Sequence, residues 1–234
     1  MKKKIVALSL VVALVAIAIV GASLAYFTDK DEATNVFTVG NVDIKLEENF
    51  EQNSTLRPST GSAQLGTLKN GVKKEVYVTN EGTEDAYVRV HIAIPAVLDD
   101  GDPSFDAKKN VLHFNYSPES IAEGKWDWSK SADDGVVEGN WNYYTTEIEG
   151  VAYNVYVVTY TSALSAEEST DYAIYQVYLD KKVTNHDVEL IKEKLGADWE
   201  MHVIAEAAQA EGFNDAFEAL NTAFGTPGSY NAFG

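Results

Sequence analysis

Residues 74–95 read KEVYVTNEGTEDAYVRVHIAIP and indicate the fold most clearly. Apolar and polar residues alternate before Asn80, and apolar residues again recur at alternate positions after Tyr87. This period of two is typical of a β-strand with one buried face. The residues in between favour a turn, and Pro95 ends the second strand because proline lacks a backbone donor. The sequence therefore predicts a β-hairpin over residues 74–95.

The same alternation recurs along most of the chain. It predicts strands at residues 42–47, 111–116, 125–128, 141–148, 151–163 and 172–179. The fourth and fifth of these strands face each other across Glu149–Gly150, which predicts a second hairpin. The strands do not alternate with helices, as they would in a parallel sheet. The chain is therefore predicted to be mainly β, with two antiparallel sheets packed as a sandwich.

The last third of the chain adds one or two short helices. Thr184 or Asn185 is a favourable N-cap, the apolar residues that follow are three to four apart, and Gly196 marks the end of this helix. Residues 199–210 alternate and are predicted to form a strand, although their many alanines leave a helix as the alternative.

The end of the chain is predicted from its capping and turn residues. Asn214 opens a second short helix at residues 215–224, whose apolar residues lie on one side. Residues 225–234 are rich in Gly, Pro and Ser, and are predicted to be a flexible tail.

The N-terminus has the pattern of an export signal. Lys2, Lys3 and Lys4 precede an apolar run from Ile5 to Val20, which predicts a signal helix. Ser23 and Ala25 supply small residues three and one positions before the expected cleavage site, so that the mature chain would begin at Tyr26. The alternative is an uncleaved membrane anchor, but the apolar run is short for a span of about 20 residues.

These patterns divide the chain into four parts. Residues 1–25 form a signal peptide, and residues 26–47 form the mature N-terminal segment with the first strand. Residues 48–224 form the β-sandwich, and residues 225–234 form the tail. We therefore expect secretion, with membrane contact only through an uncleaved leader.

Composition excludes several classes of function. The formal net charge of −18 repels nucleic acid and anionic membrane surfaces. The chain has no cysteine, which excludes disulfides, thiolate zinc sites, a cysteine nucleophile and a lipid anchor on cysteine. With 45% apolar residues, a chain of this length can bury a sufficient core without disulfides.

The histidines show no recognised metal or catalytic motif. None of His91, His113, His186 and His202 belongs to a His-Glu-x-x-His sequence. His202 and Glu206 could hold a metal, but a surface pair is the favoured interpretation. His91 lies among apolar residues and is expected to be a hydrogen-bonded residue within a sheet. We assign no catalytic, cofactor-binding or metal residue from the sequence.

Two other groups of residues leave alternatives open. Residues 99–102 with Asp106, and Asp133–Asp134, could bind calcium, but they do not fit the calcium-loop spacing, and solvated acidic loops are favoured. Trp126 with Trp128, and Tyr143 with Tyr144, could stack on sugars, although filling of the core by aromatic side chains is favoured.

Three stretches resemble the TasA/camelysin family of secreted proteins, whose leaders are processed by a SipW-type signal peptidase. These are GASLAYFTD at residues 21–29, FTVGNVDI at residues 37–44, and EVYVTNEG at residues 75–82 followed by Arg89–Val90. The similarity is strongest over residues 15–46 and 74–94. The C-terminal part, including AAQAEGF at residues 207–213, is similar to clostridial-type members and differs from the fibre protein of the family.

The resemblance implies a jelly-roll-like sandwich that a Gram-positive cell exports to its biofilm matrix or surface. It also implies a SipW-type signal peptidase as a partner, together with copies of this chain or related matrix subunits. In fibre-forming members the mature N-terminus of one subunit inserts as a strand into the next. The residues of this chain that correspond to such a donor strand are Tyr26, Phe27, Val36, Phe37 and Val39. Pairing of this segment within its own subunit is the alternative.

Two other functions remain as alternatives. Camelysin-like members are metalloendopeptidases, but the chain offers no zinc motif onto which their residues could be carried. A surface adhesin that binds a polymer through aromatic loops is the other alternative.

Overall fold

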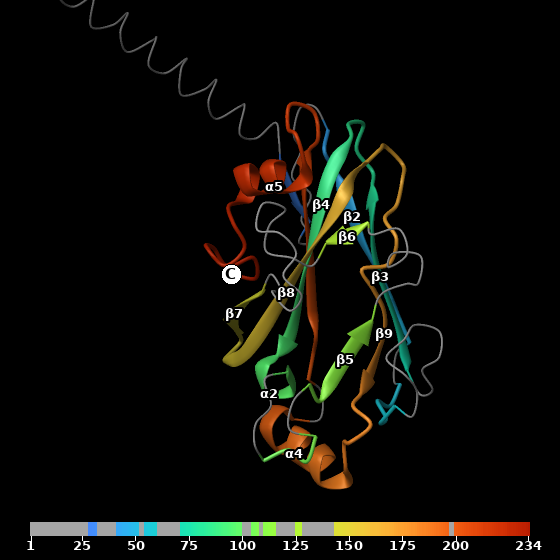
Figure 1. Cartoon of the computed structure of the whole chain (residues 1–234), viewed down its shortest axis with the longest axis vertical. Helices are drawn as coiled ribbons and strands as arrows, with labels where there is room; N and C mark the ends of the chain where they lie inside the picture. The colour runs from blue at the N-terminus through green and yellow to red at the C-terminus, as the bar shows by residue number, and fades with distance from the viewer. Residues whose placement is uncertain are drawn as a thin grey trace, which may run out of the picture.

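The computed structural model describes residues 28–31, 41–51, 54–59, 71–99, 104–107, 110–115, 125–127, 143–196 and 199–234. These residues form two antiparallel sheets (Figure 1). The larger sheet has the order β1-β10-β4-β8-β6, and β7 also pairs with β8. The smaller sheet has the order β2-β3-β9-β5. The predicted two-sheet antiparallel sandwich is therefore confirmed, whereas the jelly-roll connectivity stays a prediction.

The bounds of the elements follow the sequence patterns closely. The strands are β1 (Thr28–Asp31), β2 (Ile44–Phe50), β3 (Val72–Asn80), β4 (Ala86–Pro95), β5 (Leu112–Asn115), β6 (Trp126–Asp127), β7 (Tyr143–Ile148), β8 (Val151–Leu164), β9 (Ile174–Leu179) and β10 (His202–Gln209). The helices are α2 (Ala96–Asp99), α4 (Asn185–Leu195) and α5 (Ala216–Phe224). Figure 1 shows α2 and α4 at one end of the sandwich and α5 near the other.

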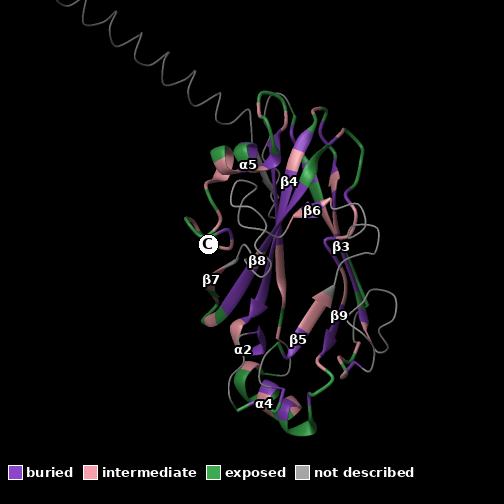
Figure 2. Cartoon of the chain, in the orientation of Figure 1, coloured by how far each residue is buried: buried purple, intermediate pink, exposed green. Residues whose placement is uncertain are grey.

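The core lies between the two sheets and is built from alternate strand residues. In β4, Val88, Val90, Ile92 and Ile94 are fully buried in one cluster with Val76 and Val78 of β3. Figure 2 shows that burial continues along β4 and β8. Each such side chain contributes roughly 1.5–3 kcal/mol when it leaves water, so these alternating residues hold the two sheets together.

The predicted hairpin over residues 74–95 is wrong, although both of its strands exist. β3 pairs with β2 and β9, whereas β4 pairs with β10 and β8, so the two strands lie in different sheets. The connection between them crosses from one sheet to the other. The Asn80 side chain directs this crossing by donating hydrogen bonds to the carbonyls of Glu84 and Leu164, at 2.8 and 2.9 Å. Strand alternation does not report which strands pair, so the sequence pattern could not show this crossing.

Gly82 in this crossing packs directly against the chain before β2. A Cβ atom at this position would lie 2.1 Å from the carbonyl oxygen of Asn41 and 2.8 Å from the amide nitrogen of Asp43. Because both neighbours are backbone atoms, they cannot move aside cheaply. We expect Gly82→Ala to lower the free energy of unfolding by about 1–3 kcal/mol. Urea denaturation measures this change, with Gly150→Ala as the comparison.

Gly150→Ala separates the effect of a steric clash on stability from the effect of backbone strain. A Cβ atom there would meet nothing within 4 Å, but the residue has a φ of 83°. Gly150→Ala therefore reports the cost of positive φ alone. A Gly82→Ala variant as stable as the wild type would contradict the close contact.

The second predicted hairpin is confirmed. β7 and β8 pair from Ile148–Val151 to Tyr143–Tyr156. Glu149 and Gly150 connect them with φ values of 51° and 83°. Two successive positive φ values are typical of the tight turn that matches the twist of paired strands.

The helices and the last strand also follow the sequence. Thr184 caps α4, with the reciprocal hydrogen bonds between Thr184 and Asp187 that form a capping box. Asp215 rather than Asn214 caps α5. Residues 202–209 form the strand β10 and not the alternative helix. The inward side chains of Val203, Ala205 and Ala207 alternate with outward ones, which explains why an alanine-rich stretch forms a strand here.

At the N-terminus, β1 pairs antiparallel with β10, from Thr28–Ala208 to Asp31–Ala205. The backbone of residues 28–31 therefore pairs within its own chain in this structure. The predicted cleavage residues Ser23, Ala25 and Tyr26 lie outside the described residues. The same holds for the other predicted donor residues, Phe27, Val36, Phe37 and Val39.

Residues 225–234, expected to be flexible, contact the larger sheet in the structure. Ala232 is fully buried, and Phe233 packs against Ala93, Tyr153 and Val155. This segment follows α5, which packs on the outer face of β4 and β10. Gly, Pro and Ser indicated a lack of regular structure but not a lack of contacts.

Candidate functional site

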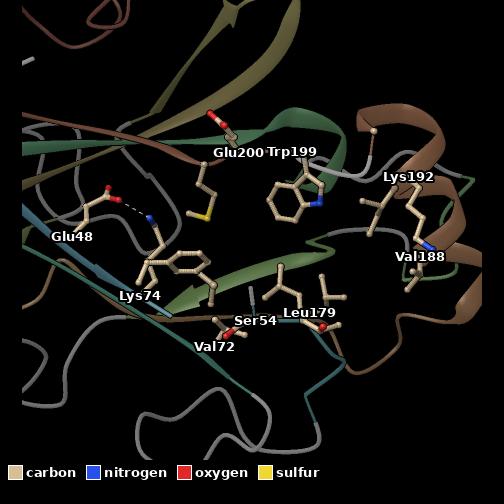
Figure 3. A pocket seen from close by; sticks show the side chains of 16 residues that line it. Glu48, Ser54, Val72, Lys74, Leu179, Val188, Lys192, Trp199 and Glu200 are labelled. Atoms are coloured by element: carbon tan, nitrogen blue, oxygen red, sulfur yellow. Dashed lines mark hydrogen bonds and ion pairs between the residues drawn. The ribbon is translucent and has the colours of Figure 1, made fainter. Parts of the chain in front are cut away.

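A cleft of about 650 Å³ opens between the two sheets near α4. Its apolar lining comes from both sheets and from α4: Phe50, Val72, Val177, Leu179, Val188, Ile191, Trp199 and Met201. Figure 3 shows Trp199 on one side of the cleft, with Val72 and Leu179 on the other. Trp199 and Met201 immediately precede the body of β10, so the cleft lies beside the start of that strand.

The rim of the cleft carries an exposed aromatic ring and an ion pair. Phe50 is 45% exposed, and among the described residues no other large apolar side chain is exposed. The Nζ atom of Lys74 lies 3.1 Å from a carboxylate oxygen of Glu48 and 5.4 Å from the centre of the Phe50 ring (Figure 3 shows the ion pair). An exposed aromatic ring beside an apolar cleft favours contact with another molecule.

The edge of the larger sheet next to this cleft is formed by the N-terminal strand β1. β1 pairs antiparallel with residues 205–208 of β10, and β10 pairs with β4 on its other side. Residues 32–40, which follow β1 in the chain, lie outside the described residues. β2 lies beside β1 and β10, so this edge and the cleft are adjacent.

A buried polar cluster lies on the outer face of β4 and β10, under α5 and residues 225–234. Arg89 donates from Nε to Glu206 Oε2 at 2.8 Å, and from Nη1 to Asn221 Oδ1 at 3.0 Å. Its Nη2 donates to the carbonyl of Gly225 at 3.1 Å and to the hydroxyl of Tyr230 at 2.6 Å. One arginine of β4 therefore binds β10, α5 and the end of the chain.

Glu206 is the acceptor at the centre of this cluster. Its Oε2 atom accepts from Arg89, from the Tyr230 hydroxyl at 2.6 Å, and lies 3.1 Å from His91 Nε2. Burial alone would raise the pKa of Glu206. The hydrogen bond and charge of His91, the charge of Arg89 and the hydrogen bond from Tyr230 outweigh burial and lower this pKa to about 2. The carboxylate is therefore ionised at neutral pH.

The tyrosines of the cluster titrate above their usual range. Burial raises the pKa of Tyr144 to about 12, and burial also raises the pKa of Tyr230. Both hydroxyls therefore keep their protons at neutral pH and remain available as hydrogen-bond donors. All the hydrogen bonds to Glu206 go to Oε2, whereas its Oε1 is buried and has no hydrogen-bond partner among the described residues. Asn221 and Tyr230 contact Arg89 from α5 and from residues 225–234.

The N-terminal part of the chain matches a known protein family. Residues 1–93 match the family model described as camelysin metallo-endopeptidase. The N-terminal part of this chain is camelysin-like. This match confirms the resemblance to the TasA/camelysin family over β1, β2, β3 and most of β4. Neither the curated proteins nor the solved structures include a match to the chain.

The camelysin description implies a catalytic metal, and such a metal needs several His, Asp or Glu ligands close together. They contain no group of three or more His, Asp or Glu side chains that could hold a metal ion. The buried cluster offers only His91 and Glu206, which are too few ligands, and the Arg89 guanidinium lies 2.8 Å from the Glu206 carboxylate, where its positive charge would repel a metal ion. The camelysin-like part of the chain, as far as it is described, does not fit a zinc site.

Of the predictions made for His91 and His202, the first is confirmed and the second is wrong. His91 is fully buried and hydrogen-bonded to Glu206 and Tyr144, so its prediction as a hydrogen-bonded residue within a sheet is confirmed. The predicted surface pair of His202 and Glu206 is wrong, because Glu206 is fully buried and pairs with Arg89. His202 instead contacts the Tyr153 hydroxyl at 3.2 Å. The outer face of β10 is covered, which period-two alternation alone does not reveal.

The predictions for the acidic loops and for the aromatic pairs can be compared with the structure at Asp99 and Trp126. Asp99 is buried and accepts hydrogen bonds from Asn154 and Tyr156, at 2.9 and 2.6 Å, so it does not belong to a solvated loop. Residues 100–102 and 133–134 lie outside the described residues. Trp126 is buried against Tyr160, as expected for an aromatic side chain that fills the core. Trp128 is not among the described residues.

The sequence did not indicate the central role of Arg89. Its position between Val88 and Val90 places it on the outward face of β4, where a charged side chain is usually solvated. One signal was present: His91 lies on the same face two residues later, which makes two ionisable groups on one short strand face.

Among the helices of the described residues, none is long and apolar enough to cross a membrane.

Proposed function

We propose that the chain is a secreted structural subunit of an extracellular or biofilm matrix. In this proposal the N-terminal segment of one copy adds as a strand to the β10 edge of the next copy. The observation that carries the proposal is the pairing of the N-terminal strand β1 with the edge of β10 beside the apolar cleft, because the same segment of another copy could take this place. The camelysin-like match over residues 1–93 supports membership of a secreted family in which this function occurs.

Strand exchange at this edge would use the cleft beside it. Main-chain hydrogen bonds to a sheet edge provide affinity, and alternate side chains of the added strand enter pockets. The four residues of β1 have the polar and charged sequence TDKD. Phe37 and Val39 lie two residues apart, so a strand from another copy would present both to one face, with Val36 on the other. Aromatic Phe50, at the rim, would cover them from solvent.

Export and processing precede assembly in this proposal. A SipW-type signal peptidase would cut between Ala25 and Tyr26, and cleavage would free the segment that acts as the donor. The partners are copies of the same chain or related matrix subunits. We propose no enzymatic activity and no cofactor, and calcium in the acidic loops is an additional hypothesis that calcium titration can test.

Electron microscopy of the processed chain tests the proposal. We expect filaments from the wild type at high concentration, including at acidic pH. Phe50→Ser should prevent filaments by opening the acceptor cleft to water, and it should leave the fold intact because Phe50 is largely exposed. Deletion of residues 26–37 should also prevent filaments, because it removes the donor. Tyr175→Ser, at a β9 residue that does not line the cleft, is the matched control and should still assemble.

A mixture of the deletion variant and Phe50→Ser tests the donor and the acceptor separately. The deletion chain keeps an acceptor and the Phe50→Ser chain keeps a donor, so an equimolar mixture should form one-to-one pairs but no filaments. Light scattering coupled to size exclusion measures these masses. Wild-type protein that stays monomeric throughout, or filaments that survive the deletion, would exclude strand donation.

A digestion assay separates this proposal from peptidase activity. The camelysin description supports cleavage of a protein such as casein. We expect no cleavage above background, with or without a chelator. Chelator-sensitive cleavage that persists in Phe50→Ser would show a metallopeptidase and reject the non-enzymatic proposal.

A further inference from the structure

The outer face of the smaller sheet, which points away from the larger sheet, carries a group of tyrosine rings. Tyr77 lies in β3, Tyr175 lies in β9, and Tyr172 lies two residues before β9. We propose that these three residues, here called the tyrosine platform, bind the sugar rings of a neutral polysaccharide. None of the three lines the cleft or pairs with β1, so the inference does not depend on strand exchange.

Strand geometry places the platform on the outer face. Tyr77 lies between two fully buried valines of β3, so its side chain points away from the core. In β9, Ile174 and Val177 both belong to the core although they are three residues apart. An irregularity in the pairing of β3 and β9 accompanies this spacing and leaves Tyr175 facing outward. All three tyrosines are partly exposed, and their rings are therefore accessible to a partner.

The three rings adjoin one another. The ring centres of Tyr77 and Tyr172 lie 5.7 Å apart, with 70° between their planes. The ring centres of Tyr172 and Tyr175 lie 5.9 Å apart, with 32° between their planes. Tyr172 is thus the central ring of the platform. The face of an aromatic ring is the negative part of its quadrupole, so the weakly positive C–H groups of a sugar ring pack favourably against it.

The charged side chains beside the platform are paired with each other. Lys73 Nζ lies 3.0 Å from Glu75 Oε2, and Asn49 Nδ2 donates to the same oxygen at 3.0 Å. On the next strand Lys45 pairs with Glu47. Each pair brings no net charge to this face, and the net charge of −18 on the whole chain repels anionic polymers. The charge distribution therefore favours an uncharged partner.

Polar groups at the platform match the hydroxyl groups of a sugar. Burial, together with the charge of Glu75, raises the pKa of Tyr172, so its hydroxyl keeps its proton at neutral pH. A phenol hydroxyl both donates and accepts hydrogen bonds. The amide of Gln176, the residue after Tyr175, lies beside Gly71, where the lack of a Cβ atom leaves it room. Aromatic faces next to hydroxyl and amide groups suit a polymer of sugar rings.

Affinity electrophoresis in native gels tests this inference. The acidic chain migrates towards the anode, whereas a neutral polymer held in the gel does not migrate, so binding appears as retardation. The neutral polymers are hydroxyethyl cellulose, laminarin and glycogen, and alginate is the anionic comparison. We expect at least one neutral polymer to retard the wild type and alginate not to retard it.

Tyr172→Ala should raise the polymer concentration needed for half-maximal retardation by roughly tenfold, because it removes the central ring of the platform. Tyr175→Ala should also weaken binding, whereas Tyr172→Phe should keep most of it because the aromatic face remains. Phe50→Ser removes an exposed ring outside the platform and is the matched control, which should be retarded like the wild type. Circular dichroism confirms that each variant is folded.

The other outcomes reject the inference. Retardation by none of the neutral polymers, or by alginate alone, excludes a neutral polysaccharide as the partner. Equal retardation of the wild type and both alanine variants places binding elsewhere on the chain. Loss of filaments with unchanged retardation in Tyr172→Ala shows that the platform contacts a second copy. Retardation that depends on the tyrosines supports the inference even if the wild type forms no filaments, in which case only the proposed function fails.

Discussion

Arg89→Met is expected to lower the free energy of unfolding by about 3–5 kcal/mol, the range observed when one partner of a buried ion pair is removed. The side chains of Arg89 and Glu206 are 2% and 0% exposed. The variant leaves the Glu206 carboxylate buried without its cation. It also removes the contacts to Asn221, Gly225 and Tyr230. Urea denaturation followed by circular dichroism measures the change.

Two further variants show that the unpaired charge causes this loss. Lys45→Met removes a partner from the exposed Lys45–Glu47 pair and should change the stability little, because water screens exposed ion pairs. The double variant Arg89→Met with Glu206→Leu removes both charges and should recover part of the stability, because no buried ion remains. An Arg89→Met variant as stable as Lys45→Met would contradict the central role of this arginine.

Acid is expected to destabilise the protein through Glu206. Because the folded state lowers the pKa of Glu206 from 4.5 to about 2, ionised Glu206 stabilises the folded state. This contribution is fully present above pH 4.5 and is lost as the pH falls from 4.5 towards 2. The loss is on the order of 3 kcal/mol, from 1.36 kcal/mol per pKa unit.

A Glu206→Gln variant isolates this contribution from the other carboxyl groups. At pH 7 the variant should be less stable than the wild type, and the difference should shrink as the pH falls from 4.5 towards 2. Unfolding free energies measured in urea at each pH provide the comparison. A difference that stays constant over this range would show that Glu206 titrates normally in the folded state.

The fold was largely predictable because strand alternation is a local property. Val88, Val90, Ile92 and Ile94 identify β4 and its buried face without any knowledge of its neighbours. Thr184 and Asp187 likewise identify the start of α4. Local patterns of this kind gave the elements and the sandwich.

Pairing between strands was not predictable in the same way. The turn-like residues 80–85 are compatible with a hairpin, but they instead carry the chain from one sheet to the other. The deciding contacts join Asn80 to Leu164 and Gly82 to Asn41, which are distant in sequence. A turn sequence shows that the chain changes direction, and only these non-local contacts show where it goes.

The buried cluster was missed for a related reason. Arg89 and Glu206 each occupy the outward face of a strand, which the alternation pattern assigns to solvent. The residues that cover this face, Asn221 and Tyr230, come from α5 and from residues 225–234. The cleft has the same character, since β2, α4 and Trp199 meet only in the folded chain.

The short pairing of β1 with β10 implies a competition that depends on protein concentration. A strand carried by the same chain acts at a high local concentration, roughly millimolar for short connections. The described residues of β1 pair with four residues of β10, however, and all four are polar or charged. In the proposed exchange, a segment from another copy that also brings Phe37 and Val39 would gain apolar contacts at the cleft. We therefore expect filament growth to begin above a threshold concentration, at which a neighbour's strand displaces the chain's own.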